Sequence, residues 1–320
     1  MIAAYAARLS AEDPMSGLEV GERPEPAARE NWTTVDVRAA SVNHHDVWSL
    51  QGVGLAAKSL PMTLGTDAAG VAPDGTEVVI HSVIGADGHG VGPRETRSLL
   101  SEHYQGTFAE RVSVPSANLL PKPAQLSFEE AACLPTAWLT AYRMLFVAAN
   151  LRPGNSVLIQ GAGGGLSSAA IALGAAAGIE IYATSRSAQK RERALTLGAT
   201  AAFEPGARLP MRVDAVIESV GKATWAHSTS SVKAGGTIAV AGLTTGDPEP
   251  ANLTRVFFQE LRIQGVTMGT REDLAALMTF MARTGLRPTI DSVMPLEQAR
   301  NAIQRVASGD HFGKVVITVN

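Results

Sequence analysis

The sequence has little cysteine, no long apolar run and no excess of one charge, and each shortage excludes a class of protein. Cys133 stands alone among 320 residues, so neither a disulfide framework nor a zinc lobe held by four cysteines can form. No apolar run reaches the roughly 18 to 20 residues needed to span a bilayer, and the opening stretch lacks the basic leader of a signal peptide. The 27 basic and 30 acidic residues are scattered along the chain. We therefore expect a soluble cytoplasmic protein with no membrane or nucleic-acid partner.

The texture of the sequence changes about two fifths of the way along the chain. Before Leu120, short apolar stretches such as VDVRAASV, GTEVVIHSV and FAERVSVP alternate with Gly, Pro and Asp clusters, which is typical of a β-rich domain. Next come a helical pattern and a capping box formed by Ser127 and Glu130. From Asn155, β-branched runs alternate with helices, which predicts a parallel sheet covered on both faces. The sequence thus predicts an α/β protein with a domain boundary near Pro123.

A glycine-rich stretch follows the first of these β-branched runs. The strand NSVLIQ leads into GAGGGLS and then into a helix of small residues, the order that places a pyrophosphate on a helix N-terminus. Ser167 takes the place of the third glycine of this fingerprint. Within this stretch, the residues expected to bind the cofactor phosphates are Gly161, Ala162, Gly164, Gly165 and Leu166.

The end of the second strand of this domain indicates which cofactor is bound. An NAD-binding fold places an acid there to hold the ribose hydroxyls, but this sequence reads Ser185 and Arg186, with Lys190 nearby. Serine can donate to a 2′-phosphate and arginine can pair with it, whereas a carboxylate would repel it. These residues predict NADPH as the cofactor. The alternative is that Arg186 and Lys190 merely form a solvated helix start.

Seven short motifs spread over nearly the whole chain carry a resemblance to a known family. They are VNHHDVW, PMTLGTDAAGV, GTFAERVSVP, LTAYRML, QGAGGG, IESVG and FGKVVI. Together they resemble the medium-chain dehydrogenase/reductase superfamily. The resemblance implies a GroES-like β-rich catalytic domain at residues 1–123, a Rossmann doubly wound domain at 124–265, and a return to the catalytic domain at 266–320.

The three positions that hold catalytic zinc in the zinc-dependent branch of that superfamily match Asn43, Thr66 and Thr136. None of these is a normal zinc ligand, so the sequence looks like the zinc-independent branch, similar to the NADPH:quinone oxidoreductases. A metal site that joins His44 or His45 with other histidines remains an alternative. The other histidine would be His81, His89 or His103.

Without zinc, a substrate carbonyl must be polarised by hydrogen bonds, so a quinone or an α,β-unsaturated carbonyl is the expected hydride acceptor. The resemblance places further residues around the reacting groups. The expected donors are Asn43, His45 and Thr136; the expected pocket walls are Trp48 and Tyr104; and Thr140, Gly242, Leu243 and Thr244 are expected to hold the nicotinamide and its ribose.

Two other functions stay open at this stage. One is a zinc-free reductase of enoyl thioesters or an aldehyde/alcohol oxidoreductase on the same fold. The other is a non-catalytic NADPH-binding or RNA-binding protein, against which the near-neutral charge argues. We also expect a homodimer, because GTIAVAG and LRIQGVTMG would leave an apolar sheet edge exposed. Phe257 and Phe258 are expected in the core, and Cys133 as a buried helix residue.

Overall fold

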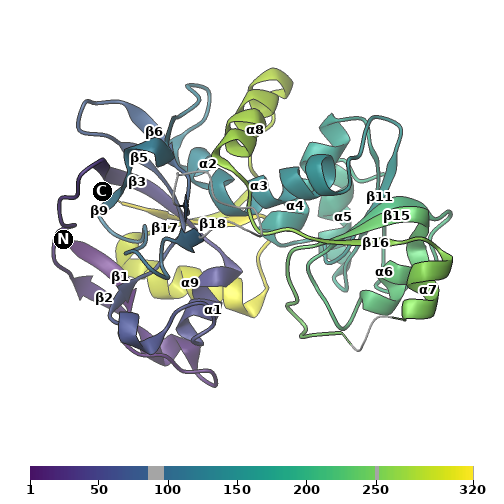
Figure 1. The fold of residues 1–320 in the computed structure, drawn as a ribbon, viewed down its shortest axis with the longest axis horizontal. Helices are drawn as coiled ribbons and strands as arrows, with labels where there is room; N and C mark the ends of the chain where they lie inside the picture. The colour runs from purple at the N-terminus through teal and green to yellow at the C-terminus, as the bar shows by residue number, and fades with distance from the viewer. Residues whose placement is uncertain (86–96, 249–251, 320) are drawn as a thin grey trace. The chain divides into compact units, whose positions relative to one another are not determined.

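The computed structural model describes residues 1–85, 97–248 and 252–319, drawn in Figure 1. Contacts divide the chain into two compact units. Unit 1 joins residues 1–137 to residues 269–320, and unit 2 is the segment between them.

The first boundary between the units lies beyond Pro123. Helix α2 (Phe128–Ala132) follows Pro123 in the chain and belongs with the first unit rather than the second. It packs against strands β3 (Trp32–Val42), β5 (Asp67–Val71) and β18 (Lys314–Thr318) of unit 1. The second boundary between the units follows Met268.

The main sheet of unit 1 has the strand order β10-β6-β5-β3-β18-β17, and β9 pairs with β3 outside this path. The alternating apolar residues of these strands fill one core, to which β3 contributes Val35, Val37 and Ala40. Strand β18 comes from the end of the chain and pairs antiparallel with β3, so the tail completes the sheet. The strands are β3 (Trp32–Val42), β5 (Asp67–Val71), β6 (Glu77–Ile80), β9 (Arg111–Pro115), β10 (Leu119–Pro121), β17 (Ile290–Pro295) and β18 (Lys314–Thr318).

Two smaller sheets and the helices α1, α8 and α9 also belong to unit 1. Strand order in the smaller sheets is β2-β1-β4 and β7-β8. Helices α8 and α9 both end at a glycine in the left-handed conformation. The bounds are β1 (Ile2–Ala6), β2 (Leu18–Glu22), β4 (Met62–Thr63), β7 (Val83–Gly85), β8 (Arg97–Leu99), α1 (His44–Leu50), α8 (Arg271–Thr284) and α9 (Ala299–Ser308).

Unit 2 contains a six-stranded, all-parallel sheet of order β13-β12-β11-β14-β15-β16. Counted within the unit, this is the order 3-2-1-4-5-6 of a dinucleotide-binding fold, so the predicted Rossmann architecture is confirmed. Ligands of such sheets bind at the carboxyl ends of the strands, where the order reverses between β11 and β14. The strands are β11 (Ser156–Ile159), β12 (Glu180–Thr184), β13 (Ala201–Phe203), β14 (Val213–Glu218), β15 (Val232–Val240) and β16 (Arg262–Gly265).

Helices cover both faces of this sheet, with α3 and α4 on one side and α6 and α7 on the other (Figure 1). Burial on both faces explains why the strands read as continuous apolar runs rather than as alternating ones. The helices are α3 (Leu139–Tyr142), α4 (Gly165–Ala176), α5 (Ala188–Thr196), α6 (Trp225–Ser231) and α7 (Leu253–Phe258).

The helical stretch that links the units is less regular than its apolar pattern predicts. The capping box of Ser127 and Glu130 is present and starts α2, and Cys133 is fully buried, as expected. A π-helical turn (Leu134–Trp138) then interrupts the α-helix at Pro135, which has no N–H to donate to the preceding turn. Burial raises the pKa of the Cys133 thiol to about 12, which keeps it protonated and unreactive.

One expectation about the core is wrong. Phe257 and Phe258, expected inside, are 63% and 71% exposed on α7, with ring centroids 4.4 Å apart. The short helix α7 precedes the edge strand β16, so only one of its faces meets the sheet. In the described residues, no helix is long and apolar enough to cross a membrane.

Candidate active site and cofactor site

The glycine loop of unit 2 follows β11 and ends at the start of α4, as the sequence predicts. Gly161 and Gly163 have φ values of +73° and +140°, which favour glycine. A Cβ on Gly161 would lie 2.6 Å from a methyl group of Val220, and one on Gly163 would lie 2.7 Å from Cδ of Lys190. A side chain at either place would therefore strain the backbone, and at residue 161 it would also clash with Val220.

The hydrogen bonds of the loop divide its residues into two groups. Gly161 and Ala162 donate their N–H groups to Thr184 at the end of β12, so they fix the loop to the sheet. Gly164 is the N-cap of α4, and no side chain of the described chain caps the helix there. The N–H groups of Gly165 and Leu166, in the first turn, are therefore the ones available to an anion.

Ser167 explains the departure from the glycine fingerprint. Its hydroxyl accepts from the N–H of Gly163 at 3.1 Å and lies 3.1 Å and 3.0 Å from the carbonyls of Gly161 and Gly164. The side chain is fully enclosed by the loop, and it cross-links the loop to the helix. A glycine at this position would only allow the helix and the sheet to pack closely. The serine also stiffens the turn through its hydrogen bonds.

The end of β12 gathers three cationic side chains. Arg186 is exposed, whereas Ser185 is buried and its hydroxyl accepts from the N–H of Ser187 at 3.3 Å. Lys190 lies over the glycine loop, with Nζ 3.1 Å from where a Cβ of Gly163 would be. Lys190 thus lies closer to the phosphate loop than a residue one turn into a helix suggests.

Arg191 is a member of this group that the sequence analysis missed. Its guanidinium donates to the carbonyl of Ser185 at 2.8 Å and forms an ion pair of 3.4 Å with the exposed Glu204. In this ion pair the positive charge of Arg191 balances the carboxylate of Glu204, which directly follows β13. The signal in the sequence was its place four residues after Ser187, the N-cap of α5.

The remaining predicted cofactor residues lie on two other segments of unit 2. Thr140 is buried in α3, while Leu243 and Thr244 are exposed in the turn after β15. This turn is held by the loop after β14: the N–H of Thr244 donates to the carbonyl of Ser219 at 3.3 Å. Gly242 lies beside the same residue, since a Cβ there would come 3.3 Å from the Ser219 carbonyl.

In unit 1, the three positions that match zinc ligands form a hydrogen-bonded cluster around Asp67. The Asn43 amide donates to Asp67 at 2.8 Å and to Thr66 at 3.2 Å. Thr136 donates to Asp67 at 2.5 Å, and the hydroxyls of Thr66 and Thr136 are 3.1 Å apart. Because the hydrogen of Thr136 goes to Asp67, Thr66 is the donor between the two threonines. The side-chain hydrogens at these three positions are thus directed at partners inside the cluster.

A buried lysine from the end of the chain completes this Asp67 cluster. Lys314 is 2% exposed, and its ammonium donates to Asn43 Oδ1 at 2.6 Å, to the Val42 carbonyl at 2.9 Å and to Asp67 at 3.5 Å. It fixes which way the Asn43 amide faces and balances the fully buried Asp67. Lys314 begins β18, and pairing of β18 with β3 brings it beside residues distant in the sequence.

Asp46 supports the cluster from the first turn of α1. Its carboxylate accepts from the backbone N–H groups of Asn43 at 2.8 Å and Gly65 at 3.1 Å. Burial raises the pKa of this carboxyl to about 6, against the opposing charge of His45 and the hydrogen bond from Asn43. Asp46 therefore joins α1 to the turn before Thr66 and is structural.

His45, the other predicted donor, belongs to a different set of contacts. Its Nε2 lies 2.8 Å from Oε1 of Glu102, and these side chains are 18% and 23% exposed. Its Nδ1 is buried and has no hydrogen-bond partner among the described residues. Burial alone would lower the pKa of His45, but the bond to Glu102 and the charges of Asp46, Glu102 and Asp67 raise it. His45 therefore holds a second proton more readily than an exposed histidine.

The two predicted wall residues have different surroundings. Trp48 is half-buried on α1, where its ring lies edge-on to that of His44 with centroids 6.1 Å apart. Tyr104 packs against Trp32 at 4.9 Å between centroids, with the guanidinium of Arg29 5.3 Å from its ring. The Tyr104 ring is thus occupied by contacts within unit 1.

The residues present do not fit a metal ion. Amide and hydroxyl groups replace zinc ligands in the Asp67 cluster, and in the described ranges no three His, Cys, Asp or Glu side chains gather in a way that could hold one. His81, named in the alternative histidine site, is buried and bonds the Gly269 carbonyl at 2.8 Å. His89 lies outside the described residues.

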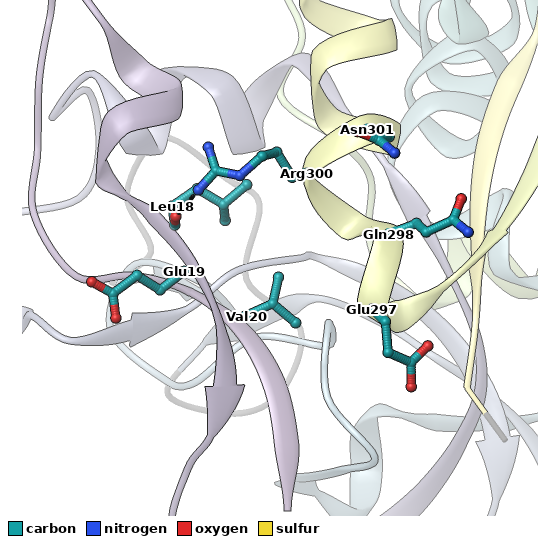
Figure 2. A pocket seen from close by; sticks show the side chains of 7 residues that line it. All are labelled: Leu18, Glu19, Val20, Glu297, Gln298, Arg300 and Asn301. Carbon is teal, nitrogen blue, oxygen red and sulfur yellow. Dashed lines mark hydrogen bonds between the residues drawn. The ribbon is translucent and has the colours of Figure 1, made fainter.

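A hollow on unit 1 between β2 and α9 is separate from these groups. Figure 2 shows its lining, and none of the predicted site residues is among them. Arg300 in its wall is committed to the backbone carbonyls of Met15 and Leu18. The lining residues are Leu18, Glu19, Val20, Glu297, Gln298, Arg300 and Asn301.

Two protein-family models match the chain. One describes an alcohol dehydrogenase GroES-like domain and matches residues 29–124, and the other describes a zinc-binding dehydrogenase and matches residues 165–283. The second range contains none of the three ligand positions. Its name therefore says nothing about metal binding by this chain.

Several known proteins are similar over nearly the full length. A zinc-type alcohol dehydrogenase-like protein of Schizosaccharomyces pombe is 30% identical, covering 89% of this chain and 90% of that protein. The structure of an NAD-dependent alcohol dehydrogenase matches with a TM-score of 0.90 and 33% identity over all of both chains. A 2-octenoyl-CoA carboxylase reductase, solved with NADP and 2-octenoyl-CoA, matches with a TM-score of 0.88 and 26% identity over 99% of this chain and 87% of that one.

Proposed function

This chain belongs to the medium-chain dehydrogenase/reductase superfamily, and we propose that it is a zinc-independent, NADPH-dependent reductase of quinones or α,β-unsaturated carbonyls. The observation that carries the proposal is the Asp67 cluster. Where a metal would need ligands, the chain has Asn43, Thr66 and Thr136 bonded to one another and to Asp67. A site of this kind offers no Lewis acid to a simple carbonyl.

The cofactor site supports NADPH through charge and backbone geometry. The free N–H groups at the start of α4 suit the pyrophosphate, and Ser185 with the exposed Arg186 suits a 2′-phosphate. When bound, NADPH supplies the hydride. We place Thr140 and the turn at Gly242, Leu243 and Thr244 around its nicotinamide end, as the family resemblance implies.

We assign different roles to the three expected donors. Asn43 and Thr136 donate their side-chain hydrogens within the Asp67 cluster, so we assign them a structural role in the site. His45 is the one with a ring nitrogen left over, and we propose that it donates to the substrate oxygen. One donor suffices for a conjugated acceptor because the developing charge is delocalised onto oxygen. We propose that Trp48, on the same helix, forms a wall of the substrate pocket, whereas Tyr104 stabilises unit 1.

An enoyl thioester is the second candidate substrate. It is also a conjugated acceptor, and one similar structure, the 2-octenoyl-CoA carboxylase reductase, holds such a compound. The same donor chemistry serves both classes, so they differ in how the remainder of the substrate is bound.

Turnover of NADPH with a panel of acceptors tests the function. We expect kcat/KM for quinones, enones or enoyl thioesters to exceed that for matched saturated aldehydes by at least about tenfold, because only the former delocalise charge. The comparison of enones with enoyl thioesters of equal chain length separates the two candidates. Turnover confined to aldehydes and alcohols would overturn the proposal.

We predict that the protein binds no stoichiometric zinc. At the three ligand positions the chain has one amide and two hydroxyl groups instead of thiolates and imidazole. These are not the ligands that zinc prefers. Elemental analysis of protein purified without a chelator or a metal-affinity tag checks this. One tightly retained zinc per chain would contradict it.

We also propose a homodimer formed along the edge of the unit 2 sheet. Strand β16 ends the sheet, and Ile263 on it is 43% exposed, as are Phe257 and Phe258 on the preceding helix at 63% and 71%. Sedimentation at micromolar concentration should give twice the chain mass, and Ile263→Asp should shift the equilibrium to monomer. Val293→Asp, on the edge strand of unit 1, is the matched control and should leave the mass unchanged. A monomeric wild type would refute the proposal.

A further inference from the structure

The pairing of His45 with Glu102 joins two segments that are distant in the chain. His45 lies in the first turn of α1, and Glu102 lies in the turn that follows β8. Their 2.8 Å contact involves Nε2 of the ring, so it determines which nitrogen is taken and which is left. Nδ1 is the nitrogen left over, and it is buried with no partner in the described part of the chain.

The fold is built to admit the carboxylate at this place. Gly54 has a φ of +82°, and a Cβ on it would lie 2.5 Å from Oε1 of Glu102, so a side chain at residue 54 would displace the carboxylate. Ser101, just before Glu102, takes a φ of +70°, which is uncommon for a residue with a side chain. Its N–H donates to the Tyr104 carbonyl at 2.7 Å, and the packing of Tyr104 on Trp32 anchors the turn.

The charged groups around the ring favour its protonated form. Glu102 faces Nε2 directly, Asp46 follows on the same helix, and Asp67 contributes from the end of the main sheet. Together they outweigh the burial that disfavours charge, and the pKa of His45 is raised. A protonated His45 holds Nε2–H against Glu102 and has a second hydrogen on Nδ1.

We propose that Glu102 is the positioning residue for the proton donor of this enzyme: its carboxylate holds Nε2–H of His45 and leaves Nδ1–H to protonate the substrate. The inference rests on the proposed function. In the step, the β-carbon of the acceptor gains the hydride, the electron pair of the double bond moves toward the carbonyl oxygen, and that enolate takes the Nδ1 proton. His45 becomes neutral with hydrogen on Nε2, and solvent returns the proton to Nδ1 after product leaves.

The test substitutes Glu102→Gln, which keeps the shape of the side chain and an oxygen that accepts from Nε2–H but removes the charge. Histidine-labelled protein gives the pKa of His45 by NMR, with His45→Gln identifying its signal among the seven histidines. We expect the pKa to fall by about one unit or more. The high-pH limb of the kcat profile for NADPH oxidation should move down by the same amount. At the same time KM should stay nearly constant and kcat near pH 8 should fall roughly tenfold.

Two further variants serve as a second route and a control. Gly54→Ala should displace the carboxylate without changing its charge and should move the His45 pKa and the kcat profile in the same direction. Glu12→Gln changes an exposed glutamate of unit 1 and should move neither.

The outcomes separate this inference from the function on which it rests. If acceptors are reduced but Glu102→Gln leaves both the His45 pKa and the pH profile unmoved, the positioning role is overturned and the function stands. If no acceptor is reduced, the function fails, while a lowered His45 pKa still supports the hold of Glu102 on the protonated ring. An unmoved pKa in Glu102→Gln overturns that hold whatever the activity.

Discussion

Replacing Lys314 by methionine should destabilise unit 1 by about 3 to 5 kcal/mol, because it leaves the buried charge of Asp67 without its partner. Lys314 is 2% exposed and Asp67 is fully buried, so water cannot take over the ammonium's place. At the same time the amide oxygen of Asn43 loses the ammonium that donates to it at 2.6 Å. Urea unfolding followed by tryptophan fluorescence reports the effect through Trp32 and Trp48, both in unit 1.

The double variant Lys314→Met with Asp67→Asn shows whether charge is the cause. Since it removes both charges together, it should recover a large part of the loss, whereas two independent packing defects would add. Lys58→Met, at an exposed lysine of unit 1, should change stability by no more than about 0.5 kcal/mol. A Lys314→Met protein as stable as wild type would show that the Asp67 cluster does not depend on this charge.

Arg186→Ala should weaken NADPH binding by roughly tenfold to a hundredfold while leaving NADH almost unaffected. The expected loss is that of one charge-assisted contact to the 2′-phosphate, about 1.5 to 3 kcal/mol. Ser185→Asp should go further and lower or reverse the preference, because its carboxylate repels the phosphate and accepts from the ribose hydroxyls of NADH. The measurement is the pair of dissociation constants for each variant.

Arg152 is a matched control for Arg186, and Arg191 is a second arginine near the 2′-phosphate site. Arg152 is exposed just before the amino end of β11, whereas the cofactor binds at the carboxyl ends of the strands, so Arg152→Ala should change neither constant. Arg191 is held by Ser185 and Glu204, and we expect it to contribute less than Arg186. Equal losses for both cofactors in Arg186→Ala, or a wild type that prefers NADH, would contradict the NADPH assignment.

Local patterns in the sequence were enough for the architecture of unit 2. Continuous apolar strands alternating with helices require a parallel sheet, and a glycine stretch between the first strand and its helix marks the phosphate end of that sheet. The capping box at Ser127 and Glu130 was likewise visible because its partners lie three residues apart. These features depend on neighbours in the chain, which a sequence displays directly.

The exposure of side chains near the edge of the unit 2 sheet could not be predicted from local patterns. Phe257 and Phe258 are apolar and lie in a helical pattern, which favours a core position, yet both are exposed on helix α7, which precedes the edge strand of the sheet. Whether an apolar residue is covered depends on what packs over it. That is a property of the assembled unit.

The sequence by itself determined that the three expected ligand positions carry Asn43, Thr66 and Thr136, none of which is a normal zinc ligand. Only the tertiary structure decided what takes its place. Lys314 meets Asn43 from 271 residues away, and Glu102 meets His45 from 57 residues away. A charged side chain buried as deeply as that of Lys314 is stable only when paired, and both pairings are made by strand register and turn geometry rather than by neighbours in the chain.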